Sequence, residues 1–365
     1  MKKDLKVIGL TKRMLRDGIN QHNYWSEEHP PFPKSKALWL LTNPRILEDD
    51  YCCVITLEDT KLISFIYMIP DVLNVPDKIK TKVYWMISWW VHPEYKNTVL
   101  GTYTFYEALK LADNKIIIKF YAEHIADFYA KQPFTVIASR LRYTIFFSAD
   151  PSMLIGKFKF LKPFRILLNT IDFGVAAIIK KMNYNKLKNN TKTLKYHYLN
   201  ELDDETWNFI EPLCANDLIL KTKAYVNWHI DNKQYTQLVV PSKHKYHALE
   251  TGESYNIYNH SLKIIKDDKT IGFISYIINF NECNVKYFLV EKEVHYNTCV
   301  DALIENFISK KAKFIFTDDP KLAETILKRF QTVFTYKSEK KGLAHNSLNL
   351  TPDIVNLLNS DGHFY

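Results

Sequence analysis

The residues best suited to chemistry gather in one stretch, from Trp89 to Thr102. The run before it, 83–91, is uncharged, β-branched and aromatic, which predicts a buried strand, and the apolar spacing of 99–112 predicts a helix. A loop between a strand and a helix start suits anions, because the N–H groups of the first helical turn and the positive end of the helix dipole point into it. The stretch therefore predicts a phosphate-binding loop.

Side chains and backbone groups of this loop could share the contacts to a phosphate. Lys96, Asn97 and Thr98 offer an ammonium, an amide and a hydroxyl, although a plain polar loop would have the same composition. The residues that we expect to form the binding loop are Trp90, Val91, Lys96, Asn97, Thr98, Val99, Leu100, Gly101 and Thr102.

The length and composition of the chain limit the classes of protein to which it could belong. With 365 residues, the chain is long enough for two domains that each bury a core. Its 47% hydrophobic and 14% aromatic content excludes a disordered chain. Residues 1–10 lack the pattern of a secretory signal peptide, so we expect none.

The cysteines indicate the compartment. They are odd in number and include no C-x-x-C pair, which argues against a disulfide framework and against a zinc site. We therefore expect a reducing, cytoplasmic location and no bound metal. The cysteines are Cys52, Cys53, Cys214, Cys283 and Cys299.

An internal repeat divides the chain. The segment 57–66 aligns without gaps on 265–274 with five identities in ten positions, and both segments read as hairpins. Upstream of each hairpin lies a Trp-x-x-x-Asn echo, at Trp39 and at Trp228. Two echoes in the same order indicate duplicated domains, because a solenoid repeat would be far shorter. The predicted parts are an N-terminal domain at 1–150, a basic helical connector at 151–193 and a C-terminal domain at 194–365.

Each copy is predicted to be a mixed α and β domain of the α+β class. Both copies are expected to run from a strand through helices to a hairpin, a central strand, a helix, a strand, a helix and final strands. In the first copy the expected elements lie at 5–10, 11–47, 52–69, 83–91, 99–112, 116–121, 125–131 and, as a pair of strands, 135–147. In the second copy they lie at 195–199, 204–228, 255–278, 285–290, 298–308, 314–317, 321–330 and the tail through 350.

Two short motifs carry a resemblance to a known family. Val91 to Gly101 is similar to a coenzyme A loop of the pattern V-x-P-E-Y-R-G-x-G-x-G, and Phe128 to Phe134 is similar to a helix end of the pattern F-Y-x-K-x-G-F. In these motifs and in its order of elements, the chain resembles the GCN5-related N-acetyltransferases, or GNAT fold. The resemblance implies two tandem domains, each a twisted, mostly antiparallel sheet flanked by helices. It also implies acetyl-CoA or another acyl-CoA as co-substrate.

The sequence departs from this pattern at identifiable positions. Lys96 replaces the usual arginine, Val99 replaces the first glycine, and Pro133 replaces the last glycine of the second motif. Glycine permits φ > 0 and a close approach of the backbone to pyrophosphate, which a β-branched residue resists. The corresponding stretch of the second copy, 291–298, contains no glycine. We expect the second copy to be degenerate and to bind no coenzyme.

The resemblance also implies a mechanism. An acceptor amine attacks the acyl thioester, a base takes its proton, and a tyrosine protonates the thiolate; Tyr129 matches the acid position. His92 is the favoured base because its ordinary pKa near 6.5 suits proton abstraction. Glu94, Glu123 and a relayed water are alternatives. The structural alternatives are that Tyr129 is a core residue and that His92 is a solvated loop residue.

A looser resemblance concerns 223–228 and the terminal 361–365, which are similar to GNAT proteins of bacterial surface-polysaccharide biosynthesis. It raises an amino sugar as the small-molecule amine acceptor, with the aromatic segment from His22 to Trp39 in the place of an acceptor-binding loop. We therefore expect an N-acyltransferase whose second copy shapes the acceptor site or a homodimer. The alternatives are a Fem-like aminoacyl transferase that uses aminoacyl-tRNA, and a catalytically silent GNAT-fold scaffold protein.

The middle of the chain is strongly basic. Between 151 and 195 there are ten basic residues and one acid, Asp172. The apolar run at 158–182 is interrupted by this acid and is too short to span a bilayer. The favoured interpretation is an interdomain helix, and the alternative is peripheral contact of 157–195 with the inner face of a membrane. No recognition motif for a specific nucleic acid accompanies it.

Overall fold

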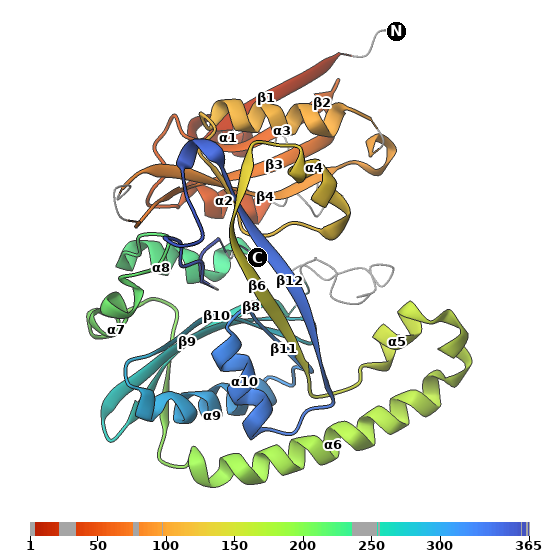
Figure 1. The fold of residues 1–365 in the computed structure, drawn as a ribbon, viewed down its shortest axis with the longest axis vertical. Helices are drawn as coiled ribbons and strands as arrows, with labels where there is room; N and C mark the ends of the chain where they lie inside the picture. Colours follow the sequence, from red (N-terminus) through yellow and green to blue (C-terminus); the bar gives the residue numbers. More distant parts are fainter. Residues whose placement is uncertain are drawn as a thin grey trace. The chain divides into compact units, whose positions relative to one another are not determined.

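A computed structural model of the chain groups its residues into two compact units, each with both strands and helices, which confirms the predicted α+β class (Figure 1). Unit 1 comprises 1–139, 214–236 and 340–365, and unit 2 comprises 140–213 and 237–339. The structure describes residues 4–21, 34–75, 80–96, 98–235, 254, 256–358, 360–362 and 364. Three predictions therefore lie wholly or partly outside the described residues: Asn97 in the loop, most of the aromatic segment 22–39, and part of the terminal segment 361–365.

The sheet of unit 1 is antiparallel through its first four strands, as predicted. Its fifth strand pairs in parallel with the fourth, and the last strand of the chain pairs antiparallel with the fifth. In sheet order these strands are β1 (Leu5–Thr11), β2 (Tyr51–Glu58), β3 (Lys61–Val72), β4 (Lys82–Val91), β5 (Ile116–Ile118) and β12 (Phe334–His345).

The helices of unit 1 follow the predicted order. Apolar residues of α3 and α4 pack with those of β3, β4 and β5 into one buried cluster that includes Phe105 and Tyr129. The helices are α1 (Lys12–Asn20), α2 (Lys34–Leu41), α3 (Leu100–Leu111), α4 (Ala126–Ala130) and α8 (Lys223–Ile230), with short 3₁₀ turns η1 (Pro93–Tyr95), η2 (Glu123–Ile125) and η5 (Asn232–Gln234).

From β7 (Lys195–Leu199) onward the chain repeats the order of elements of its first part, although α8 of this second series belongs to unit 1. Unit 2 contains most of this second series. Its core lies between the sheet and the helices α9 and α10. The strands are β6 (Phe134–Phe146), β7 (Lys195–Leu199), β8 (Tyr258–Lys266), β9 (Lys269–Asn279), β10 (Glu282–Val290) and β11 (Phe314–Thr317). The helices are α5 (Pro151–Lys157), α6 (Arg165–Asn190), α7 (Asp204–Ile210), α9 (Glu293–Ser309) and α10 (Pro320–Arg329), with 3₁₀ turns η3 (Lys159–Phe164) and η4 (Glu211–Cys214); a last turn, η6 (Asn346–Leu348), follows β12 in unit 1.

The repeated segments form the predicted hairpins. β2 pairs with β3 around a turn in which Asp59 has φ 55°, and β8 pairs with β9 around Asp267 and Asp268, with φ 50° and 57°. Aspartate tolerates this left-handed conformation better than bulkier residues do, which suits it to tight hairpin turns.

One predicted detail of the first copy is wrong. The expected pair of strands at 135–147 is a single strand, β6, of 13 residues. Its sequence contains no Gly, Pro, Asn or Asp, so nothing in it favours a turn. Residues 134–139 of β6 belong to unit 1 and 140–146 to unit 2.

The compact units are discontinuous in the sequence. Helix α8 and the last residues of the chain, which the repeat assigns to the second copy, belong to unit 1. The units group residues by contact, whereas the predicted boundaries at 150 and 194 follow the repeat. These boundaries stay a prediction.

Candidate active site

The site in unit 1 begins with a β-bulge near the end of β4. Phe65 pairs with Trp90 and Tyr67 pairs with Ile87, so β4 has one residue more than β3 between these pairs. Ser88, inside the bulge, has φ 52°. A left-handed conformation is uncommon for a serine, and such strained positions and bulges cluster at functional sites.

Because neighbouring strand residues point to opposite faces, the two tryptophans after the bulge have different surroundings. The Trp89 ring lies 5.4 Å from that of Phe105 and 5.3 Å from that of Phe128. The Trp90 ring lies 5.7 Å from that of Phe65. Among the described residues, the buried Nε1–H of Trp89 has no hydrogen-bond partner. A buried N–H donor without an acceptor is unusual, and it marks a place where a ligand oxygen could bind.

The loop after β4 is held by the neighbouring hairpin. The His92 N–H donates to the Ile63 carbonyl at 2.8 Å, and His92 Nδ1 accepts from the Glu94 N–H at 3.3 Å. Glu94 forms an ion pair with Lys61 at 2.6 Å. His92, the predicted base, and Glu94, one of the alternatives, therefore both have structural roles in the loop.

A second anchor completes the loop. The Tyr95 hydroxyl donates to the carboxylate of Glu58, at the end of β2. The Lys61 ammonium lies 5.4 Å from the centre of the Tyr95 ring. The contacts of Tyr95 with Glu58 and Lys61 thus hold the 3₁₀ turn that precedes α3.

The start of α3 avoids the strain that the sequence suggested for Val99. Val99 has φ −72° and ψ −4°, an ordinary right-handed conformation, and its side chain is 63% exposed. It provides no side-chain cap for the helix. The Thr98 hydroxyl donates to the Tyr95 carbonyl at 2.7 Å and accepts from the Leu100 N–H at 3.3 Å. The exposed Lys96 precedes this turn.

Gly101 allows α3 to lie against β4. A Cβ atom at this position would lie 2.7 Å from Val91 Cγ2 and 3.7 Å from the Trp89 ring. The φ of Gly101 is not in the left-handed region. Its role is therefore close packing of the helix start on the strand end.

Tyr129 lies in the aromatic cluster that joins the two motifs. Its ring is 5.1 Å from that of Tyr121, 5.9 Å from that of Phe105 and 5.5 Å from that of Phe128. Burial, with a smaller contribution from Tyr121, raises the pKa of Tyr129 above its ordinary value. Phe105 and Phe128 also contact Trp89. The structure therefore brings the end of β4, the start of α3 and helix α4 together.

Unit 2 has a cavity in the corresponding place. Its volume is about 220 Å³, and it lies where β10 ends and α9 begins. Glu293 in the first turn of α9 forms an ion pair with Lys321 at 2.5 Å. Carboxylates at a helix start disfavour a bound phosphate, which fits the predicted absence of coenzyme binding by this copy. The lining residues are Leu213, Phe288, Leu289, Val290, Glu291, Lys292, Glu293, Tyr296 and Lys321.

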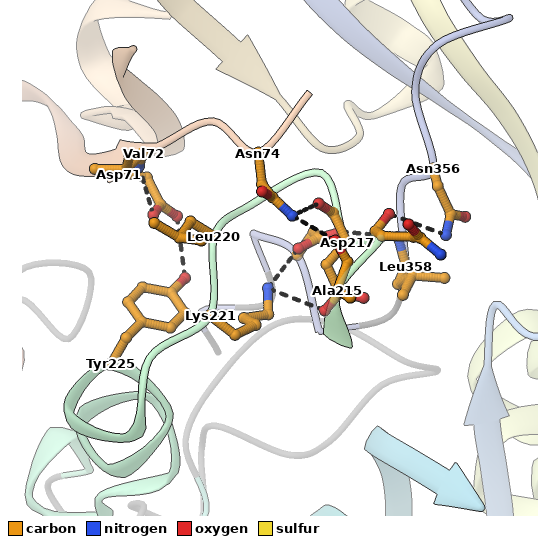
Figure 2. Close-up of polar contacts among 12 residues, drawn as sticks. Asp71, Val72, Asn74, Ala215, Asp217, Leu220, Lys221, Tyr225, Asn356 and Leu358 are labelled. Carbon is orange, nitrogen blue, oxygen red and sulfur yellow. Dashed lines mark hydrogen bonds and ion pairs between the residues drawn. The ribbon is translucent and has the colours of Figure 1, made fainter. Parts of the chain in front are cut away.

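Sequence reasoning missed a buried polar network in unit 1 (Figure 2). The Asp71 carboxylate accepts from Trp85 Nε1 at 2.8 Å and from the Tyr225 hydroxyl at 3.0 Å, and it also pairs with Arg45. The Leu220 N–H donates to the Val72 carbonyl at 3.0 Å. These contacts join β3 and β4 to the segment before α8.

A second group of charges holds the end of the chain in unit 1. The buried Lys221 ammonium lies 2.5 Å from an Asp361 oxygen and 3.6 Å from an Asp217 oxygen. Burial, followed by the Asp361 charge, raises the pKa of Asp217, and Lys221 opposes this effect. Gly362 has φ 60°, and a Cβ there would lie 2.8 Å from the Trp85 ring. Residues 223–228 and the described residues of 361–365, linked in the sequence only by a loose resemblance, belong to one unit, and Trp228 contacts Phe364 in it.

Comparisons with known proteins found similarity in structure and none in sequence. No family model matches the sequence, and no curated protein matches it. Among solved structures, the chain is similar to a GCN5-related N-acetyltransferase from Kribbella flavida, with 10% identity, a TM-score of 0.48, and coverage of 93% of this chain and 71% of that one. It is also similar to a GCN5-related N-acetyltransferase from Anabaena variabilis, with 8% identity, a TM-score of 0.46, and coverage of 93% and 72%.

Proposed function

We propose that unit 1 is an acyl-CoA-dependent N-acyltransferase that acts on a primary amine, with an amino sugar as the acceptor class. The observation that carries the proposal is the unpartnered indole N–H of Trp89 at the β4 bulge, where the two motifs meet. The order of elements in unit 1, β1-α1-α2-β2-β3-β4-α3-β5-α4-β6, supports it as well, because this is the order in the fold that the sequence resembles.

The residues around the bulge fit an acyl-CoA. Lys96, Thr98 and the first turn of α3 would hold its pyrophosphate, because an ammonium, a hydroxyl and the positive end of a helix dipole all favour phosphate oxygens. Trp89 would offer a hydrogen bond to an oxygen of the acyl or pantetheine part, inside an otherwise apolar cluster. When bound, the co-substrate supplies an acyl group activated as a thioester.

The protein moves two protons in this proposal. As the acceptor nitrogen bonds to the acyl carbon and the carbon–sulfur bond breaks, the amine loses a proton and the thiolate gains one. Tyr129 gives the second proton, because its raised pKa keeps the phenol protonated at neutral pH. A thiol with an ordinary pKa of about 8.5 is a good leaving group, so this donation adds a modest factor.

The first proton has two candidate acceptors. His92 Nδ1 accepts from the Glu94 N–H, so a neutral His92 carries its own proton on Nε2. To act as the base, Nδ1 must release this hydrogen bond. A water relayed to His92 is the other route. His92 Nδ1 is used by the hydrogen bond from the Glu94 N–H, and the Glu94 carboxylate is used by the ion pair with Lys61. Because neither group is open to an amine, these contacts favour a second candidate function, a protein that binds acyl-CoA without turnover.

Thermal unfolding with acyl-CoA tests the proposal. A ligand that binds only the folded state stabilises it by about 2.7 kcal/mol at a hundredfold excess over its dissociation constant. We expect acetyl-CoA or a longer acyl-CoA to raise the melting temperature, and an amino sugar to be acylated in its presence. Absence of any shift at millimolar concentrations would exclude the acyltransferase. A shift without turnover on any amine would favour the silent binding protein.

A further inference from the structure

The face of unit 2 formed by η3 and α6 carries apolar side chains that are open to solvent. Ile166 is 82% exposed, Phe173 is 78% exposed and Phe160 is 72% exposed. Apolar side chains exposed in this number on one segment are typical of an interaction site on a folded protein. The exposed apolar residues of this face are Phe158, Phe160, Phe164, Ile166, Leu167, Ile171, Phe173, Val175, Ile178, Met182 and Tyr184, which we call the α6 face.

The opposite side of α6 is fixed to unit 2. The buried Asp172 carboxylate accepts from the Ser148 hydroxyl at 2.8 Å and from the Ala149 N–H at 2.7 Å. Asn183 exchanges two hydrogen bonds with the backbone of Gln331, both at 2.9 Å, and Leu187 lies in the core. Positions 172, 183 and 187 lie on one side of a helix. The helix is therefore held in one rotation, with the exposed residues of the α6 face on its remaining surface. Figure 1 shows α6 as a long helix at the border of unit 2.

The charged side chains of the segment that carries the α6 face are almost all positive. The segment 151–195 has ten basic residues and one acid, and this acid, Asp172, is buried on the inner side. The outer side is therefore apolar and cationic. Lys186 and Lys195 are bonded to unit 2 itself, Lys186 to the Arg329 carbonyl and Lys195 to Asp268. The other exposed basic residues of the segment are Lys159, Lys162, Arg165, Lys180, Lys181, Lys188 and Lys192.

We propose that the α6 face binds the surface of an anionic lipid membrane, with α6 lying in the plane of the interface. Apolar side chains enter the boundary between headgroups and acyl chains, and the lysines contact anionic headgroups. No helix among the described residues is long and apolar enough to cross a bilayer, so this contact is peripheral.

Two other occupants fit the α6 face less well. A second copy of the chain would bring its own basic, acid-poor face against this one, and like charges would repel. A nucleic acid would pair with the lysines but would leave Ile166 and other aliphatic side chains in water, because these do not stack on bases. Only an anionic membrane satisfies both the charge and the apolar surface. This inference goes beyond the proposed function and does not depend on it.

Co-sedimentation of the full chain with vesicles tests the proposal. We expect binding to vesicles that mix phosphatidylglycerol with phosphatidylcholine, weakening with salt, and at least about tenfold weaker binding to pure phosphatidylcholine. The double change Ile166→Glu and Phe173→Glu should abolish binding without lowering the melting temperature, because both side chains are exposed. The double change Lys180→Gln and Lys181→Gln should weaken binding about thirtyfold, the effect of two lysines at an anionic surface.

A control is the double change Leu47→Glu and Leu38→Glu, which places the same two charges at exposed apolar residues of unit 1, 67% and 46% exposed, and should leave vesicle binding unchanged. The proposal is overturned if anionic vesicles bind no better than neutral ones. It is also overturned if the Ile166 and Phe173 variant binds vesicles normally but splits a dimer on size exclusion. Binding to duplex nucleic acid that the lysine changes abolish and the apolar changes spare, together with no vesicle binding, would assign the face to a polyanion instead.

Discussion

Trp39 and Trp228, the tryptophans of the two Trp-x-x-x-Asn echoes, stack on each other in unit 1. Their ring centres are 4.1 Å apart and their planes differ by 11°. Trp39 Nε1–H donates to the Trp228 carbonyl at 2.9 Å, and Trp228 Nε1–H donates to the Trp39 carbonyl at 3.0 Å. The equivalent positions of the repeat therefore contact each other reciprocally, and Phe364 packs beside both rings.

This reciprocal pair predicts coupled stability. Trp39→Phe and Trp228→Phe each leave a buried carbonyl without its donor, so each should lower the free energy of unfolding by about 1–3 kcal/mol. Because the rings also contact each other, the double variant should depart from additivity by about 0.5–1.5 kcal/mol. Urea denaturation of the four proteins measures this. Strict additivity would show that the stack contributes nothing beyond burial.

The start of α3 can be tested without disturbing its packing. Val99→Glu places a carboxylate at an exposed helix start, where it should stabilise the helix by about 0.3–1 kcal/mol. The same charge repels a bound pyrophosphate and should weaken acyl-CoA binding at least about tenfold. Calorimetry measures the binding, and thermal unfolding measures the stability. Tyr106→Glu, at an exposed position further along α3, is the control and should bind normally.

This variant is more informative than a change at Gly101. The Cβ of any side chain at position 101 would lie 2.7 Å from Val91 Cγ2. A loss of acyl-CoA binding could then result from displacement of α3 from β4. Normal acyl-CoA binding by Val99→Glu would contradict the assignment of the loop to pyrophosphate.

Removing the Tyr129 hydroxyl separates catalysis from packing. Tyr129→Phe keeps the ring in its cluster, so acyl-CoA binding and KM should persist while kcat falls about 10²-fold. The raised pKa of Tyr129 means that its proton is lost only above its ordinary value of about 10. The wild-type pH–rate profile should therefore show no alkaline decline from this residue below about pH 10. Unchanged kcat in the variant would assign Tyr129 to the core alone.

The catalytic role of His92 can be tested with a substitution that keeps its role as the N-cap of η1. Asparagine is a favoured N-cap residue, so His92→Asn should preserve the hydrogen bond from the Glu94 N–H and the position of the loop. If His92 is the base, kcat should fall about 10²-fold while acyl-CoA binding persists. His92→Ala, which loses both roles, should weaken acyl-CoA binding as well. Equal activity of the asparagine variant and the wild type would favour a relayed water that does not use His92.

The buried thiols predict how stability depends on alkaline pH. Burial, with a smaller contribution from Asp50, raises the pKa of Cys52 to about 12, and burial raises that of Cys299 to about 12. A folded-state pKa above the unfolded value gives stability that is complete below the unfolded pKa, about 8.5, and is lost as pH rises toward 12. Each thiol should then cost about 1.4 kcal/mol per pH unit over this range. Urea denaturation at rising pH measures the slope.

A variant provides the control for this slope. Cys299→Ala removes one ionisable group, so its unfolding free energy should decline less steeply above about pH 9 than that of the wild type. Its absolute stability at neutral pH is lowered by the cavity, which does not affect the comparison of slopes. Identical slopes would mean that the Cys299 thiol ionises equally in the folded and unfolded states.

Most local elements and their order could be predicted from the sequence. The hairpins at 57–66 and 265–274 follow from polar turn residues between apolar runs, and both form as predicted. The strand, loop and helix from 83 to 112 follow from a change in apolar spacing. These features depend on neighbours in the chain, so composition and spacing are sufficient to find them.

The tertiary structure alone decided how the candidate site is built. Val99 has φ −72°, and the 3₁₀ turn before it is held by Lys61 and Glu58, which lie on another part of the chain. The bulge at Ser88 and the unpartnered Nε1 of Trp89 arise from the register of β4 on β3 and from helices packed above it. Such features depend on residues far apart in the sequence, and no periodicity records them.

The same reason explains the placement of α8. Its sequence predicts a helix, but only the contacts of Trp228 with Trp39, and of Tyr225 with Asp71, place it in the unit that carries the candidate site. Local sequence selects a secondary structure, whereas long-range burial selects the partner on which that structure packs.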